Sequence, residues 1–169
     1  MGSLGSSGAA EFILPSEQVQ LIKDSFKAKI QADVPYHAMT LFINLFKIVP
    51  EAKGLISMTR DYTGPMRENK ALQAHATTVL KKVVNIATNL DKEKQVEMYR
   101  TSLATLGGRH IGYGVKLKHA AKLRDAFVLT IANAMGDTWR GDVEAAWIAA
   151  YDAIEQMFVV GLVGLAAPK

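Results

Sequence analysis

The sequence predicts an all-α fold, built as one domain with six or more helices of unequal length. Through most of the chain after residue 14, apolar residues recur every three or four positions, which places them on one face of a helix. No segment alternates polar and apolar residues between hairpin turns, so we expect no strands. The chain has 169 residues, of which 49% are apolar, enough for one core with room for a small cofactor. Helices of such unequal length would be irregular for a four-helix bundle.

Polar residues and prolines predict where the first helices begin and end. Ser16 is expected to cap the first helix, and Asp33 with Pro35 to begin the second. Pro50 interrupts the second helix and begins a short third helix or turn. Residues 57–68 contain glycine, proline and several charges, and we expect a loop there. The inward faces are Val19, Ile22, Phe26 and Ile30 in the first helix, and Met39, Phe42, Leu45, Phe46 and Val49 in the second.

Four further helices fill the second half of the chain. Asn69 is a suitable N-cap for the first of them, and glycines at 112 and 114 end the next. The third stops near Gly136, which fits a C-terminal cap, and the last begins near Asp142. The inward residues of the first of these helices are Leu72, His75, Ala76, Val79, Val83 and Ile86, and those of the second are Val96, Tyr99, Leu103, Leu106 and His110. The inward residues of the third are Leu123, Phe127 and Ile131, and those of the last are Trp147, Tyr151, Ile154 and Phe158.

Composition excludes several classes of function. The chain has no cysteine, which rules out disulfides, thiolate zinc sites, iron–sulfur clusters and cysteine nucleophiles. The net charge of +4 is mild, and the basic residues are scattered, so we expect no nucleic-acid partner. There is no GxSxG sequence and no P-loop. The pair Gly107-Gly108 lies inside a helical pattern with no strand before it, so it is not a dinucleotide-binding loop.

The two ends of the chain differ from the domain between them. Residues 1–13 are rich in small residues, so we expect a flexible segment there, which is either an expression-tag scar or a start myristoylated on Gly2. Residues 161–169 form an apolar tail. No secretory signal and no membrane-spanning run is evident, so we expect a cytoplasmic protein, peripheral to a membrane only if Gly2 is acylated.

Two of the four histidines lie in phase with apolar stripes. His75 and His110 are 35 residues apart on different predicted helices, each flanked by aliphatic residues rather than by acids. A zinc site would need a third protein ligand nearby. The apolar surroundings instead suit a flat cofactor whose metal needs only axial nitrogens, and haem is the natural candidate. We expect His37 and His119 to be surface residues.

Four stretches of the chain together resemble the globin family. LFKIVPEAKGLI is similar to the end of the globin B helix and the C helix, and NKALQAHATTVL to the E helix with its distal histidine. LATLGGRHIGYGVKL is similar to the F helix and FG corner, and GDTWRGDVEAAWIAAYDAI to the GH corner and H helix. The resemblance covers residues 14–160 and is closer to neuroglobin, globin X and plant non-symbiotic haemoglobins than to muscle or blood globins. It implies the 3-over-3 helical sandwich of helices A–H.

The resemblance also implies roles for individual residues around haem b. His110 would be the proximal ligand of the iron. His75 would either bind the sixth position or donate a hydrogen bond to a bound ligand. The other haem contacts would be Phe42, Ile56, Val79, Leu106 and Val115.

Ile56 departs from the globin pattern. Six residues after the C-helix proline the family nearly always has a phenylalanine against the haem face, and here the residue is isoleucine. Isoleucine keeps an apolar contact but loses ring stacking, which could cost about 1 kcal/mol of haem contact. Either haem is held less tightly or Met58 fills the position.

Three functions follow from the resemblance. The first is oxygen binding or transport by a haem globin that takes O2, CO and NO reversibly, with a bis-histidyl, hexacoordinate iron when no ligand is bound. The second is an enzyme for nitric oxide dioxygenation, nitrite reduction or peroxidase-like turnover; with no flavin domain fused here, it would need a separate electron-donating reductase. The third is a globin-fold redox or gas-sensing signalling module. A monomer and a homodimer both remain open.

Overall fold

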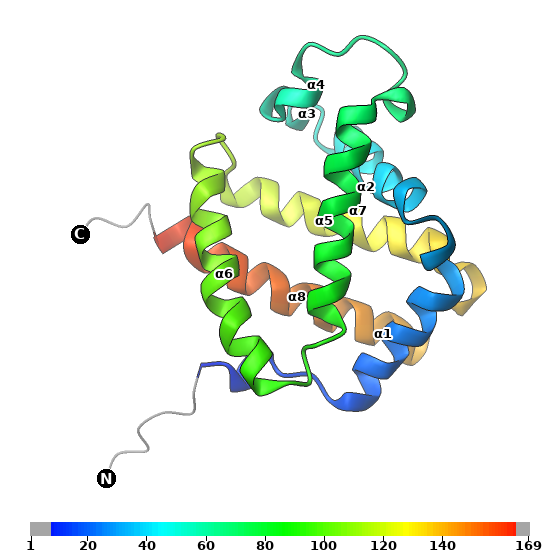
Figure 1. Cartoon of the computed structure of the whole chain (residues 1–169), viewed down its shortest axis with the longest axis vertical. Coiled ribbons are helices and arrows are strands. Elements are labelled where there is room, and N and C mark those ends of the chain that lie inside the picture. The colour runs from blue at the N-terminus through cyan, green and yellow to red at the C-terminus, as the bar shows by residue number, and fades with distance from the viewer. Residues whose placement is uncertain (1–7, 165–169) are drawn as a thin grey trace.

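The computed structural model describes residues 8–164, and within them the chain is helical with no strand (Figure 1). The predicted all-α class is therefore confirmed. The α-helices are α1 (Ser16–Lys29), α2 (Val34–Ile48), α3 (Ala52–Leu55), α4 (Ser57–Arg60), α5 (Lys70–Ala87), α6 (Glu93–Ile111), α7 (Leu117–Met135) and α8 (Gly141–Gly164). Short 3-10 turns are η1 (Ala10–Phe12), η2 (Gln31–Asp33), η3 (Met66–Glu68) and η4 (Gly136–Thr138). Gly2 and residues 165–169 of the apolar tail lie outside the described residues.

Two of the three predicted N-caps are confirmed. The Asp33 carboxylate accepts a hydrogen bond from the backbone N–H of Tyr36 at 3.1 Å, and the Asn69 side chain accepts one from Leu72 at 3.0 Å. The prediction for Ser16 is wrong. Pro15 occupies the cap position with extended backbone angles, so Ser16 is already the first helical residue and its hydroxyl caps nothing.

The predicted loop at 57–68 is partly helical, because it contains α4 and η3. The cause is Thr59, which is fully buried and donates a hydrogen bond to the Lys53 carbonyl at 2.6 Å. The Asn69 side chain also donates to the Met58 carbonyl at 2.8 Å. These contacts join residues distant along the segment, so the local composition did not reveal them.

Glycine ends the seventh helix as predicted. Gly136 follows α7 with a φ of +56°, in the left-handed region that side chains disfavour, and its N–H bonds to the Ala132 carbonyl. Gly114 has a φ of +82° and turns the chain between α6 and α7. The sixth helix continues to Ile111, immediately before the first of the two predicted glycines.

The helices form two crossed layers, as the 3-over-3 sandwich requires. Helices α1, α5 and α6 pack across α2, α7 and α8, with α5 and α6 lying over α7 and α8 in Figure 1. One polar contact joins the layers, because the Trp147 indole N–H of α8 donates to the Ser25 hydroxyl of α1. A second, buried contact lies within the other layer, where the Asn44 amide of α2 donates to the Thr130 hydroxyl of α7. Within residues 8–164, α5 and α6 both pack on α8 but make no extensive contact with each other.

Helix α8 is long and apolar enough to cross a membrane by length and composition alone. Half of the apolar window is buried against the rest of the protein, and Trp147 and Met157 are each only 1% exposed. The core position of the helix accounts for this hydropathy.

Candidate functional site

His75 is an exposed residue of α5. Its ring lies edge-to-face with Phe42 of α2, with 5.8 Å between ring centroids. Partial burial of the ring lowers the pKa of His75 below its ordinary value of 6.5, and the charge of His110 lowers this pKa further. The two imidazoles come from helices that make no extensive contact with each other. At neutral pH, His75 is a neutral imidazole with one N–H and one free lone pair.

His110 lies near the end of α6, and one of its two ring nitrogens makes a hydrogen bond within the helix. Its Nδ1 is 2.7 Å from the backbone carbonyl oxygen of Leu106. A carbonyl oxygen only accepts, so Nδ1 carries the proton and donates, which leaves the lone pair on Nε2. This is the arrangement that orients a metal-ligating histidine. The ring is also edge-to-face with Phe158 of α8 at 5.1 Å and with Tyr113 at 5.5 Å.

The predicted apolar contacts lie on four different segments. Phe42 is 5% exposed on α2, and its ring contacts the His75 ring. Val79 on α5 and Leu106 on α6 are partly buried at the margin of the core, each one turn from its histidine. Val115 is partly buried after α6, where its N–H bonds to the His110 carbonyl at 3.1 Å. Ile56 is partly buried between α3 and α4 and packs on the core.

These residues fit a haem. Among the described residues, no group of three or more His, Cys, Asp or Glu side chains is placed to hold a bare metal ion. The available donors are instead two imidazoles on separate helices, and the His110 ring is oriented by the hydrogen bond from its Nδ1 to the Leu106 carbonyl. Partly exposed aliphatic side chains beside them provide apolar contact for a flat ring system. A porphyrin brings four metal ligands of its own and needs only one or two axial nitrogens from the protein.

The sequence reasoning missed Phe158 as a site residue. The helical spacing placed Phe158 correctly on the inward face of the last helix, but gave no sign that this face reaches His110. Only the packing of α8 on α6 brings the two rings together. No local signal in the sequence would have shown it.

The prediction that His119 is a surface residue is wrong. Its side chain is 13% exposed; Nδ1 accepts the backbone N–H of Lys116, and Nε2 donates to a Glu51 carboxylate oxygen, both at 2.9 Å. The histidine thus joins the start of α7 to the residue before α3. Together with Lys118 it lowers the pKa of the Glu51 carboxyl below its ordinary value. The three-residue spacing from Lys116, the N-cap position, is the signal that could have revealed this role.

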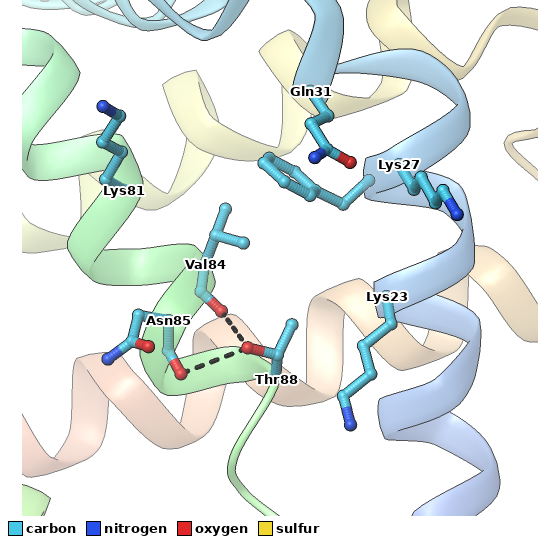
Figure 2. A pocket seen from close by; sticks show the side chains of 8 residues that line it. Lys23, Lys27, Gln31, Lys81, Val84, Asn85 and Thr88 are labelled. Carbon is cyan, nitrogen blue, oxygen red and sulfur yellow. Dashed lines mark hydrogen bonds between the residues drawn. The ribbon is translucent and has the colours of Figure 1, made fainter.

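A separate groove of about 440 Å³ lies between α1 and α5 (Figure 2). Lys23, Lys27 and Lys81 stand around it, and Phe26 and Val84 also line it. Val84 follows His75 by nine residues, which is half a turn out of phase, so this groove is on the opposite side of α5 from the histidines. It is not part of the histidine site.

Comparison with known proteins agrees with this site. The globin family model matches residues 39–158. The chain is 33% identical over 136 residues to the anaerobic nitrite reductase AHB2 of Arabidopsis thaliana, covering 80% of this chain and 85% of that protein. It is also 32% identical over 142 residues to leghemoglobin-1 of Lupinus luteus, covering 84% of this chain and 91% of that protein. The chain therefore belongs to the globin family of haem-binding proteins.

Proposed function

We propose that this globin carries haem b and binds oxygen, CO and NO reversibly, with His110 as the fixed protein ligand of the iron. The observation that carries the proposal is the Nδ1–H bond from His110 to the Leu106 carbonyl, because it leaves Nε2 free on a ring of fixed tautomer. When bound, haem supplies the metal that holds the diatomic molecule. His110 would hold the iron through Nε2, and the apolar side chains beside it would contact the ring system of the haem.

His75 has two roles open to it, and both need the neutral imidazole that its lowered pKa favours. Its lone pair would be free to bind the iron when no other ligand is present. When a ligand is bound, its N–H donates a hydrogen bond, which stabilises partly negative oxygen more than neutral CO. Phe42, in contact with the His75 ring, limits how far that ring swings.

Absorption spectra test this proposal directly. The purified protein should show a strong Soret band, and the ferrous form should have a six-coordinate spectrum that CO converts to the CO-bound form. His75→Leu should change the ferrous spectrum to five-coordinate, whereas His37→Leu, a histidine outside the site, should not. A colourless protein that ignores added haemin would refute the haem proposal; an unchanged His75→Leu spectrum would remove His75 as a ligand.

A second candidate function is nitrite reduction, favoured by the similarity to plant proteins named anaerobic nitrite reductases. Nitrite takes up one electron and two protons and gives NO and water. The bound haem supplies the electron, and a separate reductase would restore it. His75 would hold a proton against a nitrite oxygen, because its neutral ring keeps one N–H.

The test is anaerobic mixing of the dithionite-reduced, desalted protein with nitrite. We expect one NO for each ferrous haem oxidised, counted as NO released to an electrode plus NO captured by the remaining ferrous haem, with a rate that rises as the pH falls. Oxidation of the haem without release or capture of NO would contradict this second function and would leave ligand binding unaffected.

A further inference from the structure

Helices α6 and α8 approach each other more closely than side chains allow. A Cβ atom built on Gly107 of α6 would overlap the backbone carbonyl oxygen of Phe158. A Cβ atom built on Gly161 of α8 would likewise overlap the carbonyl of Ala104. Each glycine therefore leaves room for the backbone of the other helix. Helices α6 and α8 pack on each other more extensively than any other pair in the described residues.

The close crossing sets the position of the Phe158 ring. Phe158 is only partly buried, while its neighbour Met157 is 1% exposed and fills the core. The Phe158 ring lies against the His110 imidazole with 5.1 Å between centroids and 71° between planes, a favourable edge-to-face contact. Because the Phe158 carbonyl itself packs on Gly107, the distance from the α8 backbone to α6 is fixed at this residue.

His110 needs such a contact to be held in one orientation. The bond from Nδ1 to Leu106 fixes one nitrogen, but the ring is still free to tilt about that point, and the second torsion of histidine is intrinsically broad. Tyr113 also touches the ring, yet it is 63% exposed and projects from a turn. Phe158 is partly buried and projects from a long helix that packs closely on α6.

We propose that Phe158 is a positioning residue for His110, and that the close crossing of α6 and α8 at Gly107 and Gly161 places the Phe158 ring against the His110 ring. Two contacts then hold the imidazole. The Leu106 carbonyl accepts the hydrogen bond from Nδ1, and the Phe158 ring packs edge-to-face against the imidazole ring. The effect of Phe158 on the iron rests on the proposed haem function. The ring contact itself does not depend on haem.

The first experiment compares Phe158→Leu with Phe26→Leu, which makes the same change in a partly buried phenylalanine beside the groove of Figure 2. Resonance Raman spectra of the ferrous five-coordinate protein, in a His75→Leu background, report the iron–histidine stretching band. We expect Phe158→Leu to shift and broaden this band, and to speed haem loss about 2- to 12-fold, the range of one aromatic contact. Phe26→Leu should leave both unchanged.

The second experiment uses the protein without haem. NMR of the His110 ring protons should show a ring-current shift that Phe158→Leu removes and Phe26→Leu preserves. A protein that binds no haem would refute the proposed function, while this measurement would still test the contact. An unchanged iron–histidine band overturns the positioning role, even if the ring-current shift disappears.

The glycine crossing is tested by Gly161→Ala, with Gly164→Ala as its control. A Cβ at Gly161 must displace α8, whereas nothing lies within 4 Å of a Cβ at Gly164. Gly161→Ala should reproduce the Raman change of Phe158→Leu, and Gly164→Ala should not. If Gly161→Ala does not fold, the Phe158→Leu comparison still decides the proposal. A folded Gly161→Ala with the wild-type band would show that the crossing does not place Phe158.

Discussion

Replacing Ile56 with phenylalanine should slow the loss of haem from this globin. Ile56 lies between α3 and α4, partly buried against the core, and its carbonyl accepts hydrogen bonds from the N–H groups of Thr59 and Arg60, both at 3.0 Å. These bonds fix the backbone, so a ring introduced there is held in one place. In globins generally, a phenylalanine at this position of the sequence pattern stacks on the haem.

The size of the effect follows from the stacking of the new phenylalanine ring on the haem. Isoleucine already buries an apolar side chain, so the added stabilisation is mainly that of one ring stacked on another, about 0.5–1.5 kcal/mol beyond area burial. At 1.4 kcal/mol for each factor of ten, haem should dissociate about 2- to 12-fold more slowly. The apoprotein is not stabilised to a comparable degree, because its ring has no partner to stack on.

The assay is transfer of haem from the ferric protein to an excess of a haem-scavenging apoprotein, followed at the Soret band. Ile48→Phe is the matched control, because it makes the same change at the end of α2, at a residue that is 36% exposed and is not one of the predicted haem contacts. An Ile56→Phe rate equal to that of Ile48→Phe, or faster than that of the parent protein, would refute the placement of residue 56 against the haem face.

Three further predictions concern the scaffold without haem. Thr130→Val leaves the buried Asn44 amide without its acceptor and should lower the free energy of unfolding by about 1–3 kcal/mol in urea titrations, with partial recovery in the Asn44→Leu/Thr130→Val double variant. Asn69→Ala removes the N-cap of α5 and should cost about 0.5–2 kcal/mol; a loss of helix stability no larger than that of Asn89→Ala would contradict the cap. Burial lowers the pKa of His37 below 6.5, so the fold favours its neutral form, and stability present above pH 6.5 is lost as the pH falls below it. His37→Gln should make that decline shallower, and an identical pH profile would show that His37 does not contribute to it.

Much of the fold was predictable because the signals are local. Helical periodicity, the caps at Asp33 and Asn69 and the stop at Gly136 depend on residues within four positions of each other. The errors occur where distant residues decide. Pro15, and not Ser16, occupies the N-cap position of α1. The predicted loop at 57–68 contains a helical turn that the buried Thr59 stabilises through its hydrogen bond to the Lys53 carbonyl.

The candidate site shows the same division. The sequence alone determined that two histidines lie on apolar helix faces, and the four globin-like stretches gave each of them an expected role. It also showed that no thiol competes with them, because the chain has no cysteine. These properties depend on residue type and periodicity, which the order of amino acids states directly.

Tertiary structure decided how the histidines are held. The bond from His110 Nδ1 to the Leu106 carbonyl is local, within one turn of α6, but the ring contact with Phe158 exists because two glycines allow α8 to pack closely on α6. Likewise, His119 reaches Glu51 across 68 positions of the sequence. Such contacts depend on the crossing distance between helices, a property of packed side chains that no single helix carries in its own sequence.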